Sequence, residues 1–419
     1  MRDLDGILSL ANSDYSLEFA YDEMFDDLQK ATAENHRFAL FAVRGNEYVK
    51  YNVVFTTLPV VSVDGSVIGT NEDNREVFCG DMTVWEPVDR FSHSVRTQQS
   101  KVEYHFRGGT TYFEDKKSFK LSLKDADNSN RNLEFCSLGS DDDWILNSMT
   151  YDDTKLKEKI SMDLWNEMSA ATDHNYSMST GSYAEVVVNG VYEGLYLLQR
   201  RVDPKYLSLS DSDILLKGKP TYHPQTVSDG YEIKYSPFSE EETYKIAEDT
   251  LINGDFSVYN TDNIVDIHLF LELGAMSDNA SYKNMYYLLK YKDGGYQVHI
   301  VPWDTDMSFG IMWGNDFEVL TQKAIRYTVM RDEVEEKLLV QNPTAENLIS
   351  DRWKQLRKDV FSAENISLHT DRNYALLSAS GAYIRNAEVE PLRYGGEDTI
   401  ENMKYFIAGK LKVMDEKYL

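Results

Sequence analysis

Asp278, Asn284, Asp304 and Asp306 are the residues of this chain whose types and spacing best suit chemistry on phosphate groups. The first two lie just before one apolar run, and the last two lie just after the next. Carboxylates that are confined together raise one another's pKa unless a cation neutralises them. Hard divalent cations prefer oxygen ligands of this kind. The four side chains therefore predict a site for a divalent metal ion.

A hairpin must bring these side chains together. Residues 285–291 and 296–302 are apolar and β-prone. The segment between them, Lys292-Asp293-Gly294-Gly295, contains the Asp-Gly and Gly-Gly pairs that indicate a tight turn. This hairpin would fold Asp304 back beside the segment that precedes the first strand.

The order Asp, Asn, hairpin, Asp is also the order of the protein-kinase catalytic centre. There the first Asp accepts the proton of the acceptor hydroxyl, and the Asn and the second Asp hold magnesium on the phosphates. The chain contains no HRD, DFG or GxGxxG string, so the pattern rests on order and spacing. An alternative stays open: Asp278 and Asn279 would cap a helix terminus, and Asp304 and Asp306 would only shape a turn.

The segment with Asp278 is one of several sequence blocks that occur in a fixed order. These blocks are Leu58–Asp64, Arg107–Thr111, Lys116–Leu121, Trp144–Asn147, Leu156–Ile160, Val188–Tyr196, Asp278–Asn284 and Val301–Asp306. Together they resemble the spore coat protein H (CotH) kinase family, a distant branch of the protein-kinase-like fold. The resemblance covers about Leu58 to Gly310. So many blocks in the family's order are hard to obtain by accident.

The resemblance implies an α+β, atypical protein-kinase-like fold of two lobes, with a β-rich N-terminal lobe and a mainly helical C-terminal lobe. We expect residues 1–140 to form a β-rich N-terminal region and the small lobe. Residues 141–310 would form the catalytic core with its hairpins. Residues 311–419 would form the C-terminal helical part of the large lobe.

The resemblance also implies roles for individual residues. Asp304, with Asp306 beside it, looks like the magnesium-binding aspartate of the family, Asn284 like the second metal ligand, and Asp278 like the catalytic base. ATP with Mg²⁺ or Mn²⁺ would be the cofactor. Basic side chains available to offset its phosphates are Arg107, Lys116, Lys117, Lys157 and Lys217. Any one of them alone is typical of a solvated surface, and the resemblance singles out Arg107, Lys117 and Lys217.

The chain departs from the family pattern at three positions. The family usually spaces its base five residues before the Asn, whereas Asp278 lies six residues before it and Asn279 occupies the aligned position. Arg200 stands where the family generally has Glu, and Lys157 stands where Arg is common. Either a one-residue bulge lets Asp278 reach the substrate or the base is lost. The alternative function is therefore a catalytically degenerate pseudokinase that binds nucleotide or acts as a scaffold.

The composition of the chain disfavours several classes of binding partner and of binding site. Against 70 Asp and Glu there are only 43 Lys and Arg, a net charge of −27, which disfavours attraction to nucleic acid or an anionic membrane. No apolar run is long enough to span a bilayer, so we expect no membrane span. Cys79 and Cys136 lack CxxC spacing, which argues against a cysteine-based zinc site. The 28 Tyr and 6 Trp would suit a carbohydrate-associated protein, but their scatter fits packing better.

The leading function is transfer of the ATP γ-phosphoryl group to a Ser or Thr hydroxyl of a protein. The resemblance suggests a bacterial coat or surface protein as the acceptor, at the spore coat or outside the cell. The opening Met1-Arg2-Asp3-Leu4-Asp5 has no apolar signal region, so the residues themselves do not indicate secretion. We expect a monomer.

Periodicity predicts the main elements. Residues 1–30 read as helical, and strands are expected from residue 36 to residue 135. Asn189-Gly190 is the strongest hairpin turn in the chain. Further helices are expected at about 152–165, 239–252, 263–276, 329–340, 344–362, 367–388 and 398–417.

Overall fold

The computed structural model describes most of the chain and divides it into two compact units. The described residues are 14–19, 28–70, 75–88, 94–219, 226–279, 283–313, 317–326 and 342–419. The first unit, called the barrel unit, comprises residues 1–148, 182–198 and 372–391, and the second, called the hairpin unit, comprises residues 149–181, 199–371 and 392–419. The units thus interleave along the chain.

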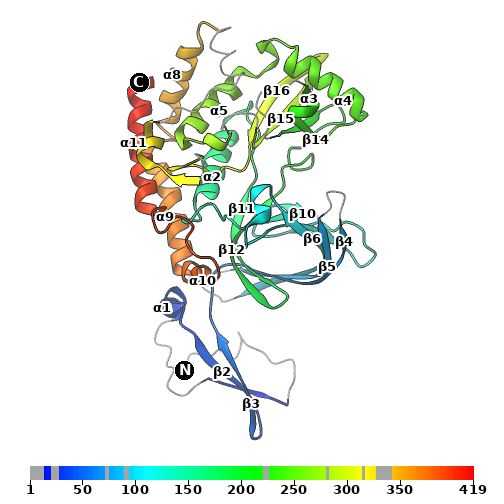
Figure 1. Ribbon diagram of the computed structural model, residues 1–419, viewed down its shortest axis with the longest axis vertical. Helices are drawn as coiled ribbons and strands as arrows, with labels where there is room; N and C mark the ends of the chain where they lie inside the picture. Colours follow the sequence, from blue (N-terminus) through cyan, green and yellow to red (C-terminus); the bar gives the residue numbers. More distant parts are fainter. Residues whose placement is uncertain are drawn as a thin grey trace. The chain divides into compact units, whose positions relative to one another are not determined.

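A small antiparallel sheet opens the barrel unit. Its strand order is β1 (Ser16–Phe19), β2 (Phe38–Arg44), β3 (Glu47–Val53), and α1 (Leu28–Ala33) lies between the first two in sequence (Figure 1). The helical prediction for residues 1–30 is wrong at β1, because those residues pair with β2 from Ser16 opposite Val43 to Phe19 opposite Leu40. Residues 1–13 and 20–27 lie outside the described residues.

Seven strands of the barrel unit close into a barrel (Figure 1). Adjacent strands of the barrel follow the order β10-β12-β11-β4-β5-β6-β7, and β10 pairs with β7 to close the barrel. β11 runs parallel to β4, so segments distant in sequence share one ladder. The strands are β4 (Val60–Thr70), β5 (Glu76–Pro87), β6 (Val95–Arg107), β7 (Ser118–Lys124), β10 (Asp143–Asn147), β11 (Gly181–Val188) and β12 (Val191–Arg200). β8 (Leu133–Glu134) and β9 (Ser140–Asp141) form a separate pair.

Alternating apolar residues fill the barrel. Val61 and Val63 of β4, and Tyr196 and Leu198 of β12, are at most 2% exposed and belong to one core with Trp144. A period of two is what places every second side chain on the inner face of a strand. The α+β class is confirmed. The two kinase-like lobes that we expected are not evident in the described part of the chain, whose β-rich portion is this closed barrel.

Buried ion pairs attach a late helix to the barrel unit. Lys116 Nζ donates to the carbonyl of Leu195 at 2.7 Å and to Glu390 Oε2 at 2.8 Å. Arg385, in α10 (Ala382–Val389), donates to Glu185 of β11 at 2.7 Å. Removing one partner of such a pair leaves a buried charge uncompensated, which explains why the helix stays with the barrel. Lys116 therefore has a structural role, because its ammonium group bonds Leu195 and Glu390.

A four-stranded sheet is the centre of the hairpin unit. Its order is β14 (Tyr231–Tyr235), β13 (Ile214–Gly218), β15 (Met285–Lys292), β16 (Gly295–Pro302). Asn263 of α5 (Thr261–Gly274) donates to the carbonyl of Ile300 and accepts from its N–H, so the helix covers the open edge of β16. Short elements beside the sheet are α3 (Val227–Gly230), α4 (Glu240–Ala247), a π-helical turn (Glu248–Ile252), η3 (Phe256–Val258) and η4 (Ser277–Asn279).

Helices complete the hairpin unit, where α5, α8 and α11 pack together (Figure 1). The helices are α2 (Lys157–Ala170), α6 (Thr321–Arg326), α8 (Ala345–Leu356) and α11 (Ile400–Tyr418), with the strand pair β17 (Ile311–Trp313) and β18 (Phe317–Val319). α9 (Ala363–Ala379) begins in the hairpin unit and ends in the barrel unit, which includes residues 372–391. The predicted helix at 329–340 lies outside the described residues. Within the part that the structure describes, no helix is long and apolar enough to cross a bilayer.

We expect the stability of the hairpin unit to depend on the charge of His369. Its ring nitrogens face Asp163 at 3.5 Å and Glu167 at 2.8 Å. The hydrogen bond to Asp163, supported by the charges of both carboxylates, raises the pKa of His369 above its ordinary 6.5. The folded state therefore binds a proton more tightly than the unfolded state does. The resulting stabilisation is complete below the unfolded pKa and is lost as pH rises through the folded pKa.

Denaturant titration of the wild type and of His369→Gln tests this expectation. The wild type should exceed the variant by on the order of 1 kcal/mol in free energy of unfolding at about pH 6, and the difference should shrink by about pH 9. An equal difference at both pH values would contradict the assignment.

Candidate active site

The end of α5 sets the position of Asp278. Ala275 adopts a left-handed conformation, with φ of 50°, and its N–H bonds the carbonyls of Glu272 and Leu271. This termination turns the chain directly into η4, which contains Asp278. The structure thus confirms that a helix near 263–276 delivers this residue.

The β15–β16 hairpin fixes Asn284 opposite the segment of Asp304. Met285 pairs with Pro302 at the end of the ladder, and Trp303 N–H donates to the carbonyl of Asn284 at 3.0 Å. Asp304 is then the next residue beyond the paired end. The predicted turn is confirmed, because Asp293 and Gly294 both have positive φ, as a two-residue hairpin turn requires.

Asn284 and Asp304 share a rare backbone conformation. Their φ angles are 56° and 58°, in the left-handed region. Asn and Asp tolerate this region better than other side chains, yet it costs of order 1 kcal/mol per residue and persists only where the surroundings impose it. Such conformations cluster at functional sites. Both candidate metal ligands are therefore held by the fold rather than by local preference.

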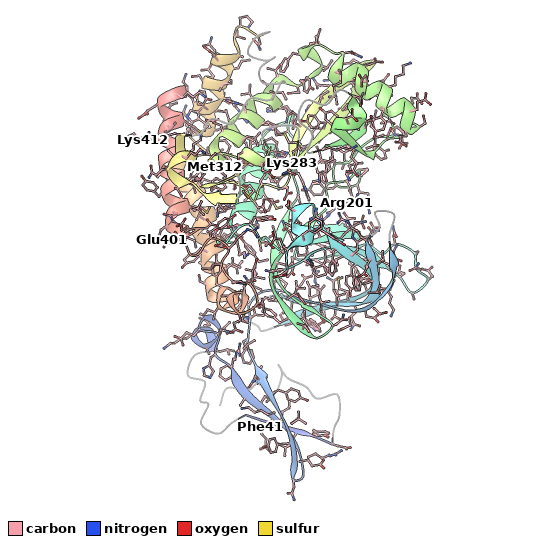
Figure 2. All side chains as sticks on the ribbon, in the orientation of Figure 1. Phe41, Arg201, Lys283, Met312, Glu401 and Lys412 are labelled. Atoms are coloured by element: carbon pink, nitrogen blue, oxygen red, sulfur yellow. The ribbon has the colours of Figure 1, made fainter. Side chains whose placement is uncertain are left out.

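Asp278 and Asn284 are in direct contact. Asn284 Nδ2 donates to Asp278 Oδ2 at 2.8 Å, and Lys283 Nζ contacts Asp278 Oδ1 at 2.6 Å. Figure 2 labels Lys283 among the side chains of the hairpin unit. Because its nitrogen is bonded to Asp278, the Asn284 amide has a fixed orientation, and its oxygen is the atom suited to a cation.

Asn279 has a different role from its neighbour. Its side chain is completely buried, and its Nδ2 donates to the backbone carbonyls of Asn284 at 3.1 Å and Trp303 at 2.9 Å. The Asn279 side chain therefore links the residue before β15 to the residue after β16. The six-residue spacing consequently places Asp278, not Asn279, against the side chain of Asn284.

Asp306 lies in a strongly acidic environment. Burial, and then the charges of Asp304, Glu158, Asp278 and Asp152, raise the pKa of Asp306 well above its usual range. Such a shift indicates carboxylates gathered without enough positive charge.

Glu158, at the start of α2, anchors the acidic loop. Its Oε2 accepts from the N–H of Thr305 at 2.6 Å and from Thr305 Oγ1 at 2.8 Å. Both groups are buried. Thr305 lies between the two loop aspartates, so the position of α2 fixes the loop that carries them.

The donor set fits a magnesium ion that is shared with phosphates. No group of three Asp, Glu, His or Cys side chains among the described residues would hold a metal by itself. Mg²⁺ is usually bound by one or two carboxylates together with substrate phosphates and water, rather than by an all-protein cage. Asp304, Asp306 and the amide oxygen of Asn284 are ligands of the types that such a site would use.

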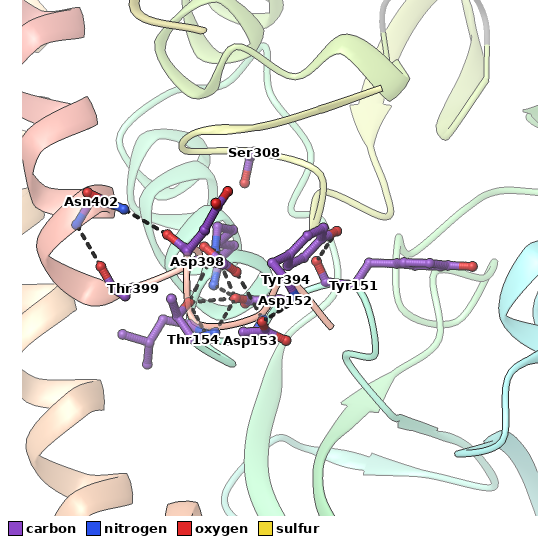
Figure 3. Close-up of polar contacts among 12 residues, drawn as sticks. Tyr151, Asp152, Asp153, Thr154, Ser308, Tyr394, Asp398, Thr399 and Asn402 are labelled. Atoms are coloured by element: carbon purple, nitrogen blue, oxygen red, sulfur yellow. Dashed lines mark hydrogen bonds and ion pairs between the residues drawn. The ribbon is translucent and has the colours of Figure 1, made fainter. Parts of the chain in front are cut away.

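Lys157 lies in a buried ionic cluster with Asp152 and Asp398, the two carboxylates labelled in Figure 3. Its Nζ bonds Asp152 at 2.9 Å and Asp398 at 2.6 Å, and the lysine is completely buried. Burial alone would lower its pKa, but the two carboxylates raise the pKa above the usual value. Its ammonium thus already has two partners, and it anchors the start of α2.

The other predicted basic residues are divided between the units. Lys217 of β13 belongs to the hairpin unit, and its Nζ lies 5.8 Å from the ring centre of Trp303, the residue before Asp304. Arg107 and Lys117 belong to the barrel unit. Arg107 pairs with Ser118, and Lys117 Nζ donates to the carbonyl of Tyr112 at 2.9 Å.

Sequence reasoning missed two residues of this site, Glu158 and Lys283. Glu158 lies within the family block Leu156–Ile160, and Lys283 directly precedes Asn284, so proximity to other candidates was the available signal. Nothing in the sequence placed either one against its partner.

A family model described as CotH kinase protein matches residues 104–414, about three quarters of the chain. The matched region includes every residue of the candidate site. A search of the curated proteins found no match to the chain.

Proposed function

Because the chain belongs to the CotH kinase protein family, we propose that it transfers the γ-phosphoryl group of ATP to a Ser or Thr hydroxyl of a protein. The observation that carries the proposal is the hydrogen bond between Asp278 and Asn284. Asn284 lies opposite Trp303 at the end of the hairpin, and Asp304 is the next residue. Mg²⁺ or Mn²⁺ is the proposed metal. The kinase-like two-lobe fold is part of the proposal and rests on the family.

The proposed roles follow from the contacts of each side chain. Asp304, Asp306 and Asn284 would hold the metal, which would link the phosphates and neutralise charge that develops on them. Asp278 would orient the acceptor hydroxyl and take its proton. Lys283 would keep the Asp278 carboxylate aligned, given the 2.6 Å contact. Lys217 would offset phosphate charge, while roles of Arg107 and Lys117 at phosphate stay predictions from the resemblance.

A degenerate kinase is the second candidate, and one observation favours it. Arg200 replaces the Glu of the family, is mostly buried, and lies with its guanidinium 5.1 Å from the ring centre of Tyr206. Such a protein would bind metal and nucleotide without transferring phosphate.

Transfer of label from γ-labelled ATP tests the proposal. The full chain would be incubated with Mg²⁺ or Mn²⁺ and an acidic, Ser-rich carrier protein, beside Asp278→Asn. We expect label in the carrier or in the chain itself, with a loss of about a hundredfold or more in the variant, because a positioned base contributes about that much. Asp211→Asn, an exposed aspartate of the same unit, is the matched control.

The outcomes separate the candidates. Label transfer that needs Asp278 supports the kinase. Metal-dependent ATP binding without transfer supports the pseudokinase. A chain that binds no ATP under any metal condition rules out both functions.

A further inference from the structure

Gln199 is a buried amide whose hydrogen-bonding capacity is unused. The residue is 1% exposed, and neither Nε2 nor Oε1 has a hydrogen-bond partner among the described residues. Among the described amide side chains, it is the one whose donor nitrogen and acceptor oxygen are both buried and unsatisfied. Glutamine is seldom fully buried, and buried polar groups in native proteins are nearly always paired. The amide therefore requires an explanation.

The backbone that follows Gln199 is anchored by hydrogen bonds. The next residue, Arg200, donates its N–H to the carbonyl of Thr180 at 2.9 Å. The carbonyl of Arg200 accepts from Ser179 Oγ, and its guanidinium faces Tyr206. The backbone at this point is thus fixed, and the buried, unpaired amide of Gln199 costs stability, as happens where a group is reserved for a ligand.

The chemistry of the amide specifies the ligand. A primary amide presents one acceptor and one donor side by side in a plane, which matches the amino group and adjacent ring nitrogen of adenine. Another arginine, Arg201, lies two residues further along a chain of net charge −27. An anionic ligand that carries an adenine base matches both features.

We propose that Gln199 binds the base of the nucleotide, with Oε1 accepting from the 6-amino group and Nε2 donating to the neighbouring ring nitrogen. This inference rests on the proposed function, since it names the residue that selects ATP. Gln199 would then be satisfied only when nucleotide is bound. The hydrogen bond from the 6-amino group to Oε1 would favour ATP over a triphosphate that lacks this group, whereas the bond from Nε2 to the ring nitrogen would form with both.

Binding of two nucleotides to the full chain tests the proposal. ATP and purine riboside triphosphate, which lacks the 6-amino group, would be titrated with Mg²⁺ into the wild type and Gln199→Met, whose side chain has similar length and no amide. We expect the wild type to prefer ATP by about tenfold, and the variant to lose that preference. The nucleotide-free variant should also melt at a higher temperature, because two unpaired polar atoms are removed.

The same measurement on Gln99→Met, an exposed glutamine of β6, is the matched control and should retain the wild-type preference. A Gln199→Met protein that melts higher but keeps the wild-type ratio of affinities would overturn the inference and leave the proposed function intact. A wild type that binds neither triphosphate would overturn both.

Discussion

Asp304→Asn is expected to abolish phosphoryl transfer and metal-dependent ATP binding. Asp304 follows the end of β16 at the site shared with Asn284, and its carboxylate is one of the charges that raise the pKa of Asp306. Without it, the metal would lose an anionic ligand. Metal stabilisation of the transition state is worth several kcal/mol, so activity should fall by about a thousandfold or more. Labelled transfer and ATP titration at several Mg²⁺ concentrations measure the loss.

Asparagine is the substitution of choice because it tolerates the φ of 58° at this position, whereas alanine would be strained. Asp293→Asn is the matched control, since Asp293 has a φ of 53° and lies in the exposed turn of the same hairpin. It should keep wild-type activity. Unchanged ATP affinity and transfer in Asp304→Asn would remove this residue from the site.

Asn279→Asp is expected to destabilise the protein, although it restores the base spacing that is usual in the family. The Asn279 amide donates to two backbone carbonyls while completely buried. A carboxylate there would lose both hydrogen bonds and would face carbonyl oxygens, in a region that already raises the pKa of Asp306. We expect the free energy of unfolding to fall by about 3–5 kcal/mol, as when a buried charge is left without a partner. Chemical denaturation measures the change.

Asn260→Asp provides the control for this exchange. Asn260 caps α5 by accepting from the N–H of Asn263, and aspartate caps helices equally well. Its stability should change little. If Asn279→Asp were instead as stable as the wild type and more active, the base would belong at the aligned position and Asp278 would lose its proposed role.

Glu158 suggests how the loop of Asp304 is held in position. It is the link between α2 and the loop of Asp304, because Thr305 bonds it through both N–H and hydroxyl. The start of α2 is in turn fixed by Lys157, whose partner Asp398 lies 241 residues further along the chain. Displacement of α2 would therefore move the loop that carries the proposed metal ligands.

The amino-acid sequence by itself determined the local parts of the site. The apolar strands around Asp293-Gly294 specified the hairpin, and the helical period before Asp278 specified α5, because both patterns act between residues close in the chain. The ordered blocks indicated the family, and the family model matches residues 104–414.

Only the tertiary structure decided which side chains meet. The spacing left open whether Asp278 reaches the substrate or the base is lost, because Asn279 occupies the aligned position. The contacts distinguish the two residues: the Asp278 carboxylate faces Asn284, and the Asn279 amide links the two strands of the hairpin. Likewise, no local pattern shows that residues 182–198 and 372–391 join the barrel unit or that Lys157 meets Asp398. Such pairings depend on long-range packing and on the burial of charge, which no local period of the sequence encodes.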